Sequence, residues 1–188
     1  FVYFNDDTFL INYVENPIDG VLYGSRNGEP TYGNGNWDGI RGPQIGWYQN
    51  TVDELNCEST LICHIPFLEY TKAYEVYKNA LNNGDTETLE QCAPIGKCKM
   101  GEASGSTLAN YGFFDVIKEK GSTKNVICGH DHKNDYSLMY EGVRLTYGLK
   151  TGDNCYWGGT GTNGYTEISI NSSGNASIDQ IYVDPFTI

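Results

Sequence analysis

The sequence predicts a layered α/β fold, because strand-like and helix-like segments alternate before a series of hairpins. Two short apolar runs, at residues 60–64 and 125–128, have the length and composition of buried strands. Apolar residues at helical spacing flank both runs, and turn-forming residues mark the hairpins. At 188 residues, the chain fits one domain (1–188) or most of a larger one.

The N-terminal third is predicted to contain two strands, a glycine- and asparagine-rich loop and a helix. The strands and the loop are expected at 8–14, 21–24 and 27–42. Pro43 then begins the helix, because proline is well tolerated in a first helical turn. Four apolar residues at helical spacing form its expected buried face: Ile45, Tyr48, Val52 and Leu55.

The middle third is predicted to contain two further helices, separated by a polar insertion. The first helix covers 70–81, and its apolar stripe consists of Tyr74, Tyr77 and Leu81. Residues 82–106 form a polar, cysteine-bearing insertion for which the sequence predicts no further organisation. The second helix covers 113–120 and ends at Gly121.

The C-terminal third is predicted to be antiparallel. Strands at 136–140 and 143–147 flank a tight Glu141-Gly142 turn, and a second hairpin joins 165–170 to 176–183. Imperfect alternation in the last strand indicates a bulge. These hairpins are expected to extend the sheet.

Composition and charge narrow the classes of function. A net charge of -12 argues against binding to nucleic acid or to anionic lipid. There is no apolar run long enough to span a membrane and no recognisable signal peptide, and the first residue is not Met. We therefore expect a processed or truncated product.

Sequons and cysteines favour secretion into an oxidising compartment. The sequons begin at Asn171 and Asn175, on one predicted turn. Cys92 and Cys98 bracket a short turn and are candidates for a local disulfide, although six cysteines allow about 15 full connectivities. Cys63 and Cys128 are expected to be small buried residues, and Cys57 and Cys155 pair only if the fold brings them together.

The three histidines lie in two short stretches, each following an apolar strand. His64 follows the first strand, and His130 and His132 belong to the stretch Gly129-His130-Asp131-His132 after the second. Neutral imidazole is the commonest protein ligand for transition metals, and a strand end presents it rigidly. These residues are candidate metal ligands; the competing interpretation is a core histidine at 64 and a polar turn in which Asp131 is solvated.

Together, four stretches resemble the calcineurin-like metallophosphoesterase superfamily, which includes the purple acid phosphatases. The stretches are Gln44-Ile45-Gly46-Trp47-Tyr48, the segment 61–70, Asn110-Tyr111-Gly112-Phe113-Phe114-Asp115, and 129–135 with Tyr147-Gly148-Leu149-Lys150-Thr151-Gly152. The resemblance implies an α/β/β/α sandwich in which His64 and His130 bind one metal ion and His132 the other. The two ions (Fe, Zn or Mn) would promote in-line attack on a phosphate ester. Adjacent polar residues then become candidates for contact with the metal ligands or for the rim of the site: Glu69, Tyr70, Asn134 and Asp135.

The chain departs from the superfamily at its N-terminal side. The family's Asp-x-His, Gly-Asp and Gly-Asn-His motifs do not occur, so the sequence resembles only the C-terminal portion of such a domain. Three interpretations follow: part of a phosphoesterase completed by a missing N-terminal segment, an inactive extracellular assembly subunit that pairs with another copy (for example in a filament), or a simple three-histidine metal binder. We expect the chain alone to be inactive, with no nucleic-acid partner and no membrane span.

Overall fold

The computed structural model describes residues 2–3, 40, 42–106, 110–152, 155–172 and 175–183. Its elements, in chain order, are β1 (Val2–Tyr3), α1 (Gly42–Leu55), β2 (Ser59–Ile62), α2 (Leu68–Asn83), α3 (Thr86–Cys92), α4 (Phe113–Lys120), β3 (Thr123–Cys128), β4 (Ser137–Tyr140), β5 (Val143–Tyr147), β6 (Gly164–Ile170) and β7 (Ala176–Tyr182). The strands expected at 8–14 and 21–24, and most of the loop expected at 27–42, lie outside the described residues.

The main sheet is mixed, with the strand order β1-β2-β3-β5-β4. Strands β1, β2, β3 and β5 pair in parallel, and β4 pairs antiparallel with β5. The carboxyl ends of β2, β3 and β5 therefore meet at one edge, where ligand sites of open α/β sheets usually lie. The chain thus has the α/β fold that the sequence predicts.

The two predicted hairpins belong to different sheets. The β4–β5 hairpin extends the main sheet, and both turn residues, Glu141 and Gly142, have positive φ (47° and 83°), as a tight two-residue turn requires. The β6–β7 hairpin instead forms a separate two-stranded sheet, so the expectation that it extends the main sheet is wrong. Its pairing runs unbroken from Gly164–Tyr182 to Ile170–Ala176, without the expected bulge.

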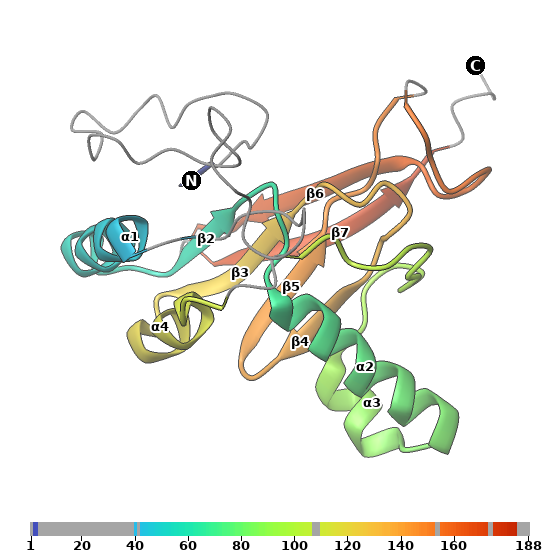
Figure 1. Ribbon diagram of the computed structural model, residues 1–188, viewed down its shortest axis with the longest axis horizontal. Coiled ribbons are helices and arrows are strands. Elements are labelled where there is room, and N and C mark those ends of the chain that lie inside the picture. Colours follow the sequence, from blue (N-terminus) through green and yellow to red (C-terminus); the bar gives the residue numbers. More distant parts are fainter. Residues whose placement is uncertain are drawn as a thin grey trace.

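The β6–β7 hairpin crosses the main sheet on the side away from the helices (Figure 1). Side chains from the hairpin bond the backbone around the end of β5. Thr166 Oγ1 accepts from the Leu149 amide at 3.0 Å, and Gln180 Nε2 donates to the Tyr147 carbonyl at 2.7 Å. The described elements thus supply a helical layer, the main sheet and a small second sheet; the complete four-layer sandwich stays a prediction.

The three predicted helices are present, but some residues predicted to be buried on them are exposed. Helix α1 buries Ile45, Tyr48 and Val52, but Leu55 is 60% exposed because the helix ends there, beyond the sheet. In α2 the buried apolar residues are Tyr70, Ala73 and Ala80. Tyr74 and Tyr77 are only partly buried against the core, and Leu81 is 52% exposed. The predicted stripe is therefore correct in part: Tyr74 and Tyr77 pack against the core, and Leu81 does not.

The insertion 82–106 is more ordered than the sequence suggested. Gly84 ends α2 in a left-handed conformation, and the next residue, Asp85, caps α3. The Asp85 carboxylate accepts from the Thr88 amide at 3.1 Å and from the Thr88 hydroxyl at 2.7 Å. This cap starts a new helix within two residues of the last one, so α2 and α3 form a short helical hairpin.

The proposed Cys92–Cys98 disulfide is not formed. Both residues are buried free thiols, and Cys98 Sγ lies 3.3 Å from the Ile95 carbonyl that it can donate to. Cys57 and Cys155 are exposed and also free. Cys63 and Cys128 are buried as expected, and burial raises the pKa of Cys63 to about 12. They therefore act as small apolar residues beneath the strand ends.

An aromatic cluster forms the centre of the core. The Tyr70, Tyr136 and Tyr147 side chains are fully buried, and the ring centroids of Tyr136 and Tyr147 lie 4.8 Å apart in an edge-to-face arrangement. Surface ion pairs join elements outside this core; Lys120 pairs with Asp53 at 2.5 Å and so connects α4 to α1. Among the described residues, no helix is both long and apolar enough to cross a membrane.

Candidate metal centre

The two parallel strands β2 and β3 bring His64 and His130 together. Beyond the strands, the pairing continues through a hydrogen bond from the Gly129 amide to the His64 carbonyl at 3.1 Å. His130 Nδ1 then lies 3.3 Å from His64 Nε2, and the two rings meet edge to face with centroids 5.3 Å apart. Both side chains are half-buried. The carboxyl edge of the sheet therefore presents two facing imidazole nitrogens.

His130 adopts an uncommon backbone conformation. Its φ is 72°, in the left-handed region, and the next amide, of Asp131, donates back to the Gly129 carbonyl at 2.9 Å. Histidine tolerates this region better than most residues other than glycine. The tight turn reverses the chain directly after β3 and turns the His130 ring toward His64.

His132 lies in a different environment. Its Nδ1 donates to the Tyr156 carbonyl at 2.9 Å, and its ring stacks on the Tyr156 ring with centroids 4.3 Å apart. In the neutral ring this bond leaves the lone pair on Nε2, the arrangement that metal-binding histidines often use. Within the described part of the chain, however, no group of three or more His, Cys, Asp or Glu residues could hold a metal ion. The structure thus pairs His64 with His130 and does not bring His132 into that pair.

Asp131 is a buried carboxylate, which makes the interpretation of a solvated turn residue wrong. Its side chain is 7% exposed and accepts from the Gly105 amide, with Oδ1 at 3.1 Å and Oδ2 at 2.9 Å. The Tyr147 hydroxyl donates to Oδ2 at 2.5 Å, and burial raises the pKa of Tyr147, which keeps this donor protonated. No local sequence signal connects Asp131 to Gly105, because the contact spans a long separation in the chain.

Asn134 and Asp135 bind backbone amides of a segment that we call the strap, residues 99–106. Asn134 Oδ1 accepts from the amides of Gly101 and Glu102, at 3.0 and 3.1 Å. Asp135 Oδ1 accepts from the Lys99 amide at 2.5 Å. Both residues are 2% exposed. The polar residues after the histidine motif therefore fasten the strap; the predicted contact with metal ligands stays a prediction.

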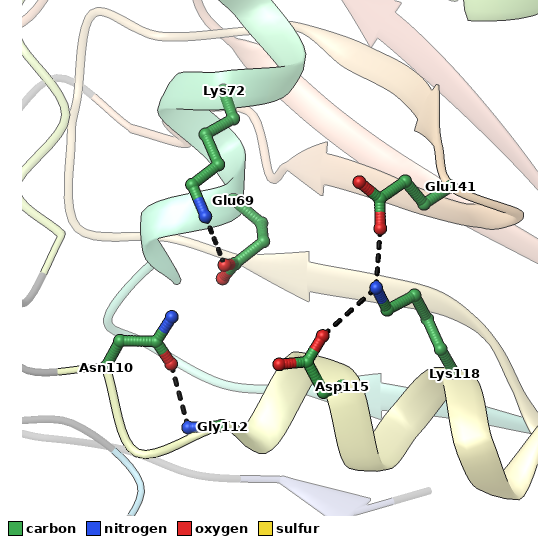
Figure 2. A network of polar contacts seen from close by, with 7 residues as sticks. All are labelled: Glu69, Lys72, Asn110, Gly112, Asp115, Lys118 and Glu141. Atoms are coloured by element: carbon green, nitrogen blue, oxygen red, sulfur yellow. Dashed lines mark hydrogen bonds and ion pairs between the residues drawn. The ribbon is translucent and has the colours of Figure 1, made fainter.

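Glu69 and Tyr70 have roles in α2 and the core. Figure 2 shows Glu69 paired with Lys72 on α2, above the start of α4, and the two charged atoms are 3.0 Å apart. The Tyr70 hydroxyl donates to the carbonyls of Val126 and Thr146, at 2.9 and 3.2 Å. These bonds connect the helix to β3 and β5. Both side chains are engaged in packing and polar contacts within the fold.

The buried Asp135 carboxyl gives a test by pH. Burial raises the pKa of Asp135, an effect that the Lys99 amide partly offsets. A carboxyl whose pKa is raised in the folded state does not lower the free energy of unfolding at a pH below its unfolded pKa of about 3.9. It lowers that free energy by the full amount at a pH above its folded pKa. We therefore expect Asp135→Asn to gain stability relative to wild type at pH 7, and this gain to shrink as the pH falls toward about 4.

Urea unfolding at several pH values measures this difference. Asp85→Asn is a control of opposite sign, because the pKa of the exposed Asp85 is lowered by its hydrogen bonds to Thr88. Stability that depends on Asp85 is present above its unfolded pKa and is lost as pH falls through the folded pKa. A gain for Asp135→Asn that is the same at pH 4 and pH 7 would show that the carboxylate charge is not the cause.

The sequon turn joins β6 to β7. The Asn171 amide donates to the Asn175 carbonyl at 3.0 Å, and the Asn175 amide donates to Asn171 Oδ1 at 3.0 Å. Both asparagines are exposed, and residues 173–174 lie outside the described residues. Glycosylation at these positions stays a prediction.

A cavity of about 160 Å³ lies at the opposite, amino end of β2 and β3. Residues from α1, the two strands and the tip of the β6–β7 hairpin line it, among them Trp47, Leu61 and Ile170. No histidine lines this cavity. The candidate metal centre is therefore separate from it.

Comparison with known proteins finds similarity to two plant proteins. The chain is 28% identical over 145 residues to a protein of Arabidopsis thaliana named "Probable inactive purple acid phosphatase 14", covering 70% of this chain and 30% of that protein. It is 36% identical over 55 residues to "Probable inactive purple acid phosphatase 29" of the same plant, covering 29% and 14%. The chain thus spans less than a third of the length of these curated relatives. No protein-family model matches it, and no solved structure matches it significantly.

These similarities support the superfamily. The relatives and the mixed α/β fold both agree with a phosphoesterase-like fold, and the word "inactive" in both names describes those two plant proteins.

Proposed function

We propose that this chain provides the histidine half of a phosphoesterase-type metal site, with His64 and His130 as two ligands of one metal ion. The observation that carries the proposal is the distance of 3.3 Å between His64 Nε2 and His130 Nδ1 at the carboxyl ends of adjacent parallel strands. Superfamily similarity adds the substrate class, a phosphate ester.

The distance fits two nitrogen ligands on one ion. Nitrogen ligands bind zinc at about 2.0–2.1 Å, so two of them at a tetrahedral angle lie roughly 3.3–3.4 Å apart. The same distance suits a hydrogen bond between the two rings. In the metal-free chain the two nitrogens would share a proton, which a bound ion would replace. Imidazole ligands suit zinc, iron and other transition metals, and carboxylate or water oxygens would suit manganese. A bound ion would supply Lewis-acid stabilisation of the charge that develops on a phosphoryl group.

Hydrolysis requires more ligands than this pair supplies. A catalytic zinc site commonly has three protein ligands, and the described residues contain no group of three candidates. We therefore propose that phosphate esters are hydrolysed only when a further polypeptide segment completes the site. His132, with Nε2 available as a lone-pair nitrogen, would bind a second ion in that complete site.

A second candidate function is an inactive scaffold in a secreted assembly. Two observations favour it: both matched relatives are named inactive, and the described candidate ligands form a pair rather than a complete set. In this proposal the fold is used for pairing with another copy, and the exposed sequon turn on β6–β7 carries glycans. Metal binding separates the two candidates.

The first test is a titration of the chain with Zn²⁺ and Co²⁺, followed by isothermal calorimetry and visible absorption. We expect one ion per chain, with loss of detectable binding in His64→Ala and in His130→Ala. His132→Ala is the matched control and should retain this ion. Equal loss in His132→Ala would favour the three-histidine binder, and no binding by the wild type would favour the scaffold.

The second test is hydrolysis of an aryl phosphate by the same metal-loaded chain. We expect negligible turnover, because two ligands leave the ion without the partners needed for catalysis. Robust turnover that disappears in His64→Ala would contradict the requirement for a further segment.

A further inference from the structure

The strap is fastened to the segment that carries the histidine motif at three separate places. Lys99, Gly101 with Glu102, and Gly105 donate backbone amides to three buried side chains, namely those of Asp135, Asn134 and Asp131. In return, Glu102 Oε1 accepts from the Lys133 amide at 2.9 Å. Hydrogen bonds therefore hold the strap against the segment 131–135 along most of its length.

Gly105 lies directly against the His130 ring. A Cβ atom added at residue 105 would fall 2.4 Å from His130 Cδ2 and 2.6 Å from His130 Nε2. Both distances are far below van der Waals contact, so Gly105 packs closely against the Cδ2–Nε2 side of the imidazole and leaves no room for a side chain there. The opposite edge carries Nδ1, which faces His64.

The Asp131 carboxylate that binds Gly105 is itself bound by a side chain of the core. Asp131 accepts the Gly105 amide with both oxygens, and the buried Tyr147 hydroxyl donates to the same carboxylate. The Ser104 hydroxyl lies 2.8 Å from the Tyr147 hydroxyl. The strap is thereby held by a side chain of β5, one of the rigid central strands.

We propose that Asp131 is a positioning residue for the metal pair, acting through Gly105. By holding the Gly105 amide, Asp131 presses the glycine backbone onto the Cδ2–Nε2 edge of His130 and directs Nδ1 toward His64. The inference deepens the proposed function and rests on it. It also assigns the strap a purpose: with Gly105 packed on the Cδ2–Nε2 side of the ring, Nδ1 is the nitrogen that faces His64 and would be presented to an ion.

The test compares two glycine-to-alanine variants of the full chain. Gly105→Ala places a methyl group against the His130 ring, whereas Gly46→Ala, in α1, meets nothing within 4 Å. Neither glycine has a left-handed φ, so alanine suits the backbone at both positions. The first readout is the set of ring-nitrogen NMR signals of the three histidines in metal-free protein. The second readout is the affinity for Zn²⁺.

We expect Gly105→Ala to shift the ring-nitrogen signals of His64 and His130, to leave those of His132 unchanged, and to weaken Zn²⁺ binding by about 10- to 100-fold. Gly46→Ala should change neither readout. Wild-type signals for His64 and His130 in Gly105→Ala would overturn the inference, whether or not the protein binds metal. Failure of wild type to bind Zn²⁺ would instead overturn the proposed function, while the NMR result would still judge the positioning.

If Gly105→Ala does not fold, Asp131→Asn and Asp131→Ala supply the same comparison. Asparagine keeps an acceptor oxygen for the Gly105 amide, and alanine removes it. We expect the asparagine variant to retain the wild-type His64 and His130 signals, and the alanine variant to shift both. Identical signals in the two variants would overturn the inference.

Discussion

Replacing Tyr70 by alanine is expected to lower the free energy of unfolding by about 3–5 kcal/mol, the usual cost of removing a buried aromatic ring. The Tyr70 side chain is fully buried at the centre of the aromatic cluster. Its ring meets that of Tyr147 edge to face with centroids 5.1 Å apart, and that of Phe67 at 6.3 Å. Alanine would leave a large cavity between α2 and the sheet. Urea unfolding followed by tryptophan fluorescence and circular dichroism measures the loss.

Two further variants separate the contribution of the Tyr70 hydroxyl from that of ring packing and provide a control. Tyr70→Phe removes only the hydroxyl that donates to Val126 and Thr146, and should cost about 0.5–1.5 kcal/mol. Tyr165→Ala is the matched control, because Tyr165 is 46% exposed on β6. A loss for Tyr70→Phe as large as for Tyr70→Ala would mean that the hydroxyl, rather than the packing of the ring, dominates at this position.

Leu145→Ala is expected to cost about 2–5 kcal/mol, as leucine-to-alanine changes in cores usually do. Leu145 lies in β5, paired with Val126 of β3 on one side and Leu138 of β4 on the other. All three side chains are fully buried. Val126 and Leu138 are held in place by their own strand pairing, so they can fill the cavity only in part. Thermal and urea unfolding both report the change.

Leu81→Ala is the control for this second variant, because Leu81 is 52% exposed at the end of α2. We expect it to change stability by less than about 0.5 kcal/mol, as is usual for exposed positions. Equal losses at Leu81 and Leu145 would indicate that α2, like the sheet, buries its predicted stripe in solution.

Local signals predicted most of the helices and the first hairpin. Pro43 and Gly121 each lie at a helix boundary, as predicted, because proline and glycine act on the backbone within one or two residues. The Glu141-Gly142 turn was equally local. The buried face of α2 was less predictable, since α3 covers part of that helix and the position of α3 depends on tertiary contacts. Asp85, with Thr88 three residues later, is a capping signal that could have revealed α3.

The candidate site was predictable in part, for a reason of sheet topology. Because adjacent parallel strands end at one edge, residues that follow β2 and β3 could be expected to meet, and His64 and His130 do. The strap could not be foreseen from sequence. Its contacts join backbone amides, which every residue carries, to side chains far along the chain, so neither residue type nor spacing records them. The burial of Asp131 and its contact with Gly105 could not be predicted for this reason.

The backbone at His130 has a consequence for what the chain retains. A left-handed φ of 72° costs a residue with a side chain about 1–2 kcal/mol, which glycine would not lose. Glycine at this position would therefore relax the turn after β3 while deleting the imidazole. Histidine at this position therefore costs conformational energy that glycine would not, and in return it supplies a ring that faces His64. At the turn positions that glycine occupies, the chain avoids this cost and has no side chain.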